Sequence, residues 1–207
     1  MITRTFVFIA AVPTALLAVV AAGTAAPPPV TISALAPVVT YGGSVTLSGK
    51  IADHAAGQTV TVLDKPSASS SFSTLGTVTT TAGGNWSDTV KSTIETAYQA
   101  NWMNQTSQAV TVKVRPLITL TLVNLSSATF STKLTAARSF AGKFVLVERL
   151  SSTGATTMKK VTLDANSSAT FTVRLHHGRN RLRVVMPTSQ TEPGYITGMS
   201  NVLSVTR

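Results

Sequence analysis

From residue 30 onward the chain alternates apolar and polar side chains with a period of two residues. Clear examples are Val-Thr-Val-Lys-Val at 110–114 and Ile-Thr-Leu-Thr-Leu at 118–122. Successive side chains of a β-strand point to opposite faces, so this alternation is typical of strands with one face on a core and one in water. No stretch sustains a helical period. The chain is therefore predicted to be all-β.

Composition narrows what can hold such a fold together. Charged residues make up only 12% of the chain, against roughly 25% in ordinary globular domains. The sequence contains no Cys, which excludes disulfides, thiolate metal ligands and Cys nucleophiles. The strands are expected to be held by packing and by ladder hydrogen bonds alone.

The N-terminus has the three-part pattern of a secretory signal. Arg4 precedes an apolar stretch at 6–22, and small residues then lead to a predicted cleavage site after Ala25. Residues 1–25 are interpreted as a signal peptide and 26–29 as a Pro-rich spacer. The alternative is an uncleaved membrane anchor; the mature chain has no second apolar run long enough to span a bilayer. We expect a secreted or extracellular protein; the alternative is that it stays associated with the cell surface.

The strand pattern occurs twice. Gly-Gln-Thr-Val-Thr-Val at 57–62 is similar to Gly-Lys-Phe-Val-Leu-Val at 142–147, and Ser-Gln-Ala-Val-Thr-Val at 107–112 is similar to Ser-Asn-Val-Leu-Ser-Val at 200–205. A repeat of roughly 90 residues with about seven short strands has the size of an immunoglobulin-type sandwich. The predicted domains are 30–115 and 116–207, and 187–198 is a longer loop in the second copy.

The first copy carries more specific motifs. These are Val-Val-Thr-Tyr-Gly-Gly-Ser-Val-Thr-Leu-Ser-Gly at 38–49, Ala-Gly-Gly-Asn-Trp-Ser at 82–87 and Ala-Val-Thr-Val-Lys-Val-Arg-Pro at 109–116. Together they resemble the bacterial immunoglobulin-like (Big-type) domains of secreted and cell-surface proteins. The resemblance covers 30–116 well and 117–207 more weakly. It implies two immunoglobulin-like β-sandwiches in tandem after the signal peptide, with spacing, adhesion or ligand-binding roles and no catalytic residues to carry over.

The sequence offers few candidate catalytic residues. The histidines are His54, His176 and His177, the acidic residues are scattered, and no nucleophile-elbow, zinc-helix or phosphate-loop motif occurs. We interpret Asp53-His54 as a polar turn. No enzyme activity, cofactor or metal site is predicted.

Two aromatic residues need separate interpretations. Trp86 is expected to face the core, because large apolar side chains dominate sandwich cores. Trp102 is a candidate for stacking on a carbohydrate; the alternative is that it covers the sandwich end or the domain junction. Tyr98 is expected to form a tyrosine corner, with its hydroxyl on the backbone.

The positive charge is uneven. The formal net charge is +10; residues 26–115 have five basic and four acidic side chains, whereas residues 116–207 have eleven and three. Excess positive charge favours anionic partners. The candidate anion-binding residues are Lys159, Lys160, Arg174, His176, His177, Arg179, Arg181 and Arg183.

These observations leave two functional hypotheses. The first is a non-enzymatic extracellular structural or adhesion module. The second is a protein whose basic second domain binds an anionic polymer (a wall polymer, an acidic polysaccharide or nucleic acid without base readout) or another surface protein. The alternative for the basic residues is a solvated face that prevents aggregation. Arg174 and the 179–183 arginines are expected on opposite sheets, which leaves open whether they form one patch.

Overall fold

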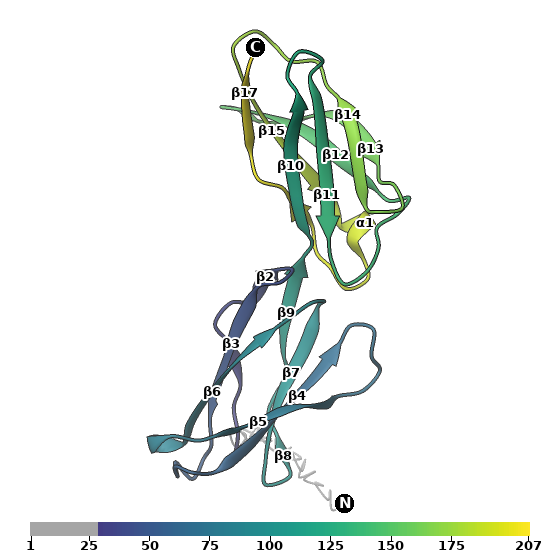
Figure 1. Cartoon of the computed structure of the whole chain (residues 1–207). Helices are drawn as coiled ribbons and strands as arrows, with labels where there is room; N and C mark the ends of the chain where they lie inside the picture. The colour runs from purple at the N-terminus through teal and green to yellow at the C-terminus, as the bar shows by residue number, and fades with distance from the viewer. Residues whose placement is uncertain (1–28) are drawn as a thin grey trace, which may run out of the picture.

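The computed structural model describes residues 29–207 and confirms an all-β chain (Figure 1). The predicted signal peptide, with its cleavage site after Ala25, and the spacer up to residue 28 lie outside the described residues. None of the helices in residues 29–207 has the length and apolar character needed to cross a bilayer.

The strands before residue 116 form two sheets, which we call the N-terminal sheet pair. One sheet has the order β1-β3-β6, and the other has the order β2-β9-β7-β4-β5 with β8 paired to β7. The bounds are β1 Ser33–Ala34, β2 Val38–Thr40, β3 Ser44–Lys50, β4 Thr59–Pro66, β5 Ser73–Thr79, β6 Asn85–Lys91, β7 Thr96–Trp102, β8 Gln105–Thr106 and β9 Val110–Arg115, with a short 3-10 turn at Ala82–Gly84.

The strands after residue 116 form the C-terminal sheet pair. One sheet has the order β10-β11-β14, and the other has the order β13-β12-β15-β16 with β17 also paired to β15. The bounds are β10 Leu117–Asn124, β11 Thr129–Thr135, β12 Phe144–Ser151, β13 Gly154–Thr162, β14 Ser168–Thr172, β15 Arg179–Met186, α1 Thr188–Thr191, β16 Gly198–Met199 and β17 Leu203–Thr206. Both strand orders are consistent with immunoglobulin-like sandwiches.

The alternation in the sequence becomes alternating burial. In β7, residues 96, 98, 100 and 102 are buried and the residues between them are half-buried. Trp86 is 3% exposed, which confirms that it faces the core. A Cβ on Gly49 would lie 2.7 Å from the Trp86 ring and 1.9 Å from the Thr31 carbonyl oxygen, so only glycine fits there.

Tyr98 corrects one detail of the expectation. Its side chain is 2% exposed, as a tyrosine corner requires. Its hydroxyl, however, lies 2.7 Å from the Ser92 hydroxyl and therefore bonds a side chain and not the backbone. Burial raises the pKa of Tyr98 above its ordinary value of 10.0.

Within residues 29–207, every paired strand has its partners inside its own sheet pair. The connection between the pairs is short, because β9 ends at Arg115 and β10 begins at Leu117. Figure 1 shows the two pairs end to end, with β9 leading directly into β10. The buried apolar side chains nevertheless form one contiguous cluster that includes members from both pairs.

The segment 192–197, after α1, makes the contact between the two pairs, and we call it the junction loop. Its backbone bonds the N-terminal sheet pair twice: the Glu95 N–H donates to the Gly194 carbonyl at 2.8 Å, and the Ile196 N–H donates to the Val114 carbonyl at 3.0 Å. The Arg115 guanidinium donates to the Thr197 carbonyl at 2.5 Å. The two sheet pairs therefore share hydrogen bonds as well as a chain connection.

Tyr195 is the centre of this contact. Its side chain is 2% exposed, and its hydroxyl donates to the Thr93 carbonyl at 2.6 Å while accepting the Ala137 N–H at 2.8 Å. One phenol thus bridges the two sheet pairs. Its ring also packs edge-on against Phe140, with 5.7 Å between the ring centroids. Burial raises the pKa of Tyr195 above its ordinary value of 10.0, and the hydrogen bond from Ala137 partly opposes that shift.

Candidate anion-binding surface

Three of the candidate arginines lie on one strand and on one face of it. Arg179, Arg181 and Arg183 alternate along β15 with Asn180, Leu182 and Val184, which are at most 2% exposed. Because alternate residues of a strand share a face, the three guanidiniums point away from the core. The sequence pattern predicted this arrangement.

Arg183 differs from the other two because it is paired. Its Nε lies 2.8 Å from a Glu148 carboxylate oxygen, and the two side chains are 26% and 15% exposed. This is the only ion pair formed within residues 29–207. Glu148 neutralises Arg183 locally, so Arg179 and Arg181 carry the available charge of β15.

Lys160 joins the same face from two strands away. In the sheet, Leu146 pairs with Lys160 on one side and with Val185 on the other. Val185 shares its face with the three arginines, and therefore so does Lys160. The Lys160 ammonium lies 3.9 Å from the centroid of the Phe144 ring, a cation–π contact that holds the side chain across the sheet.

Lys159 is turned elsewhere. It directly precedes Lys160 on β13 and therefore points to the opposite face of the sheet, where its ladder partner is Val147, which is fully buried. Its ammonium donates to the Thr172 carbonyl at 3.2 Å, at the end of β14 in the opposite sheet. Lys159 therefore closes the gap between the two sheets and does not extend the β15 face.

Arg174 follows β14 and so lies beyond the end of the opposite sheet. Its carbonyl accepts a hydrogen bond from the Arg149 guanidinium at 2.5 Å, which links the ends of the two sheets. Burial lowers the pKa of Arg149 below its ordinary value. Arg174 therefore lies at the end of the C-terminal sheet pair and does not belong to the outer face of β15.

His176 and His177 are both exposed and form the turn between β14 and β15. Asn180 holds this turn, which sequence reasoning missed. The Asn180 amide donates to the carbonyls of His176 at 2.8 Å and Gly178 at 3.0 Å, and its oxygen accepts the His176 N–H at 3.0 Å. Asn180 is 2% exposed; the only signal in the sequence was an Asn at an inward-facing strand position.

Trp102 does not offer a stacking surface. Its side chain is 8% exposed and belongs to the buried core, at the end of β7. A sugar needs a free ring face, and this one is covered by packing. Trp102 therefore covers the end of the sandwich, as the alternative interpretation had it.

Asp53 accepts the Ala55 N–H at 2.9 Å, which is the geometry of a polar turn. Within residues 29–207, no group of three or more His, Asp or Glu residues gathers in a way that could hold a metal ion.

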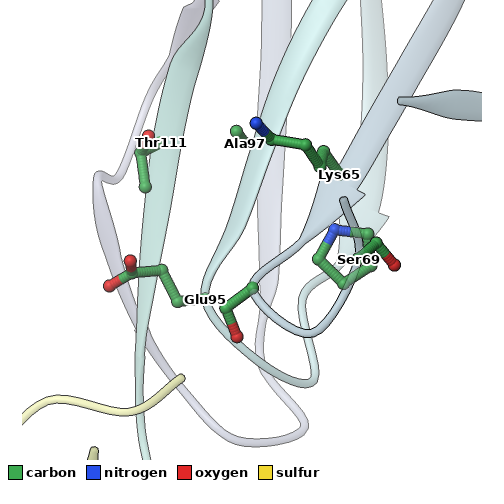
Figure 2. Close-up of a pocket in the computed structure, with 7 residues that line it drawn as sticks. Lys65, Ser69, Glu95, Ala97 and Thr111 are labelled. Atoms are coloured by element: carbon green, nitrogen blue, oxygen red, sulfur yellow. The ribbon is translucent and has the colours of Figure 1, made fainter. Parts of the chain in front are cut away.

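Two shallow hollows lie beside the junction loop. The first, about 220 Å³, is bordered by Lys65, Ser69, Glu95 and Thr111 (Figure 2). The second, about 420 Å³, shares Glu95 with it and reaches the junction loop. Ligand pockets are mostly apolar, whereas charged side chains of both signs line these hollows.

No protein-family model and no curated protein matches this chain. Among solved structures, a tetra-tandem repeat in the extending region of a large adhesion protein is 18% identical with a TM-score of 0.37, and the match covers 86% of this chain and 49% of that one. The chicken CNTN1 FN1-FN3 domains are 15% identical with a TM-score of 0.29, over 88% of this chain and 69% of that one.

A third similar structure is an alpha-2-macroglobulin from Salmonella, which is 14% identical with a TM-score of 0.31. The match covers 87% of this chain and 15% of that protein. The chain thus spans about half the length of the adhesion-protein repeat and a small part of the macroglobulin.

Proposed function

We propose that this chain is a non-enzymatic extracellular module in which two immunoglobulin-like domains, 30–115 and 116–207, act as a stiff structural or adhesive spacer. The junction is the observation that carries the proposal. Flexible tandem domains are joined by Gly/Ser-rich linkers and share little surface. Here the linker is Pro116 alone, and four hydrogen bonds from the junction loop and Arg115 reinforce it.

A distance measurement tests the stiffness. Because the chain has no Cys, cysteines introduced at the exposed positions Gln105 and Thr153 provide two unique labels, one in each sheet pair. Pulsed electron spin resonance is expected to give a single narrow distance distribution. A broad distribution in the unaltered chain would refute the spacer.

Two glycine variants separate a junction effect from a backbone effect. Gly194 has a φ of 90°, and a Cβ there would lie 2.6 Å from the Ile94 side chain in the N-terminal sheet pair. Gly142 has a φ of 74° and open space around it. Both Gly→Ala changes strain the backbone, but only Gly194→Ala is expected to broaden the distribution.

Export is a separate part of the proposal. Mass spectrometry of chain recovered outside cells that express residues 1–207 is expected to find Ala26 as the first residue. Chain that stays with the membrane fraction at its full mass would instead support the uncleaved anchor.

A second candidate function is the binding of an anionic polymer by the basic C-terminal sheet pair. The observation that favours it is the shared face of Arg179, Arg181 and Lys160, with arginine well suited to phosphate and carboxylate. Retention on heparin should fall steeply with salt, and Arg179→Ala with Arg181→Ala should weaken it. The matched control is Lys91→Ala with Lys113→Ala in the N-terminal sheet pair; equal retention of both variants would remove this candidate.

A further inference from the structure

The end of the C-terminal sheet pair that points away from the junction gathers four chain segments, 122–130, 149–154, 172–181 and 203–207 (Figure 1). We call it the distal end. Backbone hydrogen bonds hold the segments together: the Val173 N–H donates to the Ala128 carbonyl at 3.2 Å, and the Gly178 N–H donates to the Arg207 carbonyl at 2.9 Å. The Arg149 guanidinium donates to the Arg174 carbonyl.

These segments contain cations without a single Asp or Glu. Two histidines and five arginines belong to them: His176, His177, Arg149, Arg174, Arg179, Arg181 and Arg207. All but Arg149 are exposed. Because these side-chain cations are not balanced by any Asp or Glu of the same segments, this end of the molecule attracts anionic partners.

The same end also exposes aliphatic side chains. Leu122 is 38% exposed, Val123 58% and Leu125 40%, in a run of four residues at the tip of β10. The β10–β11 register shifts between Leu122 and Asn124, which leaves Val123 unpaired at the sheet edge. Exposed aliphatic side chains and exposed arginines thus belong to the same end of the sheet pair, which makes this end amphipathic.

We propose that the distal end docks on an anionic lipid surface, with the arginines at the headgroups and Val123 and Leu125 inserted between them. This inference goes beyond the second candidate function: it uses some of the same arginines, but its partner is a lipid surface and not a polymer. Anionic lipids attract clustered arginines, and partial burial of aliphatic side chains adds to that attraction. A soluble polymer would use the arginines and leave the aliphatic side chains in water, which is why the lipid surface fits the observations better.

The test uses the chain from Ala26, which keeps every described residue and lacks the apolar stretch at 6–22. Binding is measured by cosedimentation with vesicles of phosphatidylcholine and phosphatidylglycerol, and with vesicles of phosphatidylcholine alone. We expect binding to the anionic vesicles only. Val123→Ser with Leu125→Ser should weaken that binding roughly tenfold, because two partly buried aliphatic side chains are lost.

The matched control removes exposed apolar side chains elsewhere. Leu35 and Met103 are 82% and 67% exposed and lie in the N-terminal sheet pair; Leu35→Ser with Met103→Ser should leave vesicle binding unchanged. Arg174→Ala with Arg179→Ala should weaken binding and reduce its salt dependence. Thermal melting of each variant shows whether the fold is kept.

The heparin column separates this inference from the candidate function beneath it. Heparin retention that is unaffected by Val123→Ser with Leu125→Ser, alongside weakened vesicle binding, supports the lipid surface. Two results overturn the inference and leave a polymer-binding site. One is heparin retention without binding to anionic vesicles, and the other is vesicle binding that is equal with and without Val123→Ser and Leu125→Ser. If the unaltered chain binds neither heparin nor anionic vesicles, both the inference and the second candidate function are overturned. If the unaltered chain self-associates and Val123→Ser with Leu125→Ser abolishes that association, the surface binds a second copy of the chain, and the inference is also overturned.

Discussion

Replacing Tyr195 with Phe removes one oxygen atom that serves both sheet pairs. The ring stays in place against Phe140, so the change isolates the hydroxyl. The Thr93 carbonyl loses its donor and the Ala137 N–H loses its acceptor. Each hydrogen bond contributes about 0.5–1.5 kcal/mol net, and the two together about 1–3 kcal/mol.

Water can reach part of the freed groups, because Thr93 and Ala137 are exposed residues. We therefore expect a loss of about 2 kcal/mol in the free energy of unfolding. For a folded chain of this size, that corresponds to a melting temperature lower by roughly 4–8 °C. Urea denaturation followed by tryptophan fluorescence measures the first quantity, and calorimetry measures the second.

The control is Tyr98→Phe, which removes a hydroxyl that bonds Ser92 inside the N-terminal sheet pair alone. It should cost about 1 kcal/mol and leave the distance between labels at Gln105 and Thr153 narrow. Tyr195→Phe should lower stability and broaden that distance. A loss below about 0.5 kcal/mol with an unchanged distance would show that the phenol does not hold the sheet pairs together.

Three further changes test other parts of the structure. Arg183→Ala leaves the half-buried Glu148 carboxylate without its partner, so the free energy of unfolding in urea should fall by about 1–2 kcal/mol, and heparin retention should change little. Unchanged stability with reduced heparin retention would mean that the ion pair is not formed. Asn180→Ala removes three hydrogen bonds of the 176–178 turn and should cost about 2–3 kcal/mol, which a normal melting curve would contradict. Burial raises the pKa of Tyr98 and Tyr195 in the folded state above 10.0, so the stability that the protonated phenols provide is complete below pH 10.0 and falls as the pH rises toward the folded-state pKa. Tyr195→Phe should flatten that alkaline loss, and an equal slope in both proteins would refute the assignment.

The strands could be predicted from the sequence because their cause is local. The run 118–122 forms β10 as alternation predicts and buries Ile118 and Leu120, and it departs from the pattern only at Leu122, where the strand runs beyond the core. Trp86 follows the same rule. The shared face of Arg179 and Arg181 was predictable for the same reason, since period two fixes a side chain's direction within one strand.

The remaining features depend on contacts between residues far apart in the chain. Tyr195 bonds Thr93 and Ala137, which are 102 and 58 residues away, and no local pattern reports such partners. Lys159 and Lys160 are neighbours on β13 and lie on opposite faces by alternation, but only the contact of Lys159 with the Thr172 carbonyl shows that it reaches the opposite sheet. The β12–β13 ladder also shifts its register just beyond this pair, between Val147 and Glu148. A bulge reverses the phase of every later residue on its strand, so a candidate surface that spans several strands cannot be assembled from alternation alone.

We assign different roles to the two ends of the C-terminal sheet pair. Near the junction, the long loop that distinguishes the second copy from the first supplies the hydrogen bonds to the N-terminal sheet pair. At the distal end, the arginines and exposed aliphatic side chains belong to other loops and share no hydrogen bond with it among the described residues. Sites that share no partners contribute to stability and binding almost independently. Gly194→Ala should therefore loosen the junction yet leave the affinity of the distal end for anionic vesicles unchanged; if affinity fell in parallel with stiffness, the two ends would have to be coupled through the core.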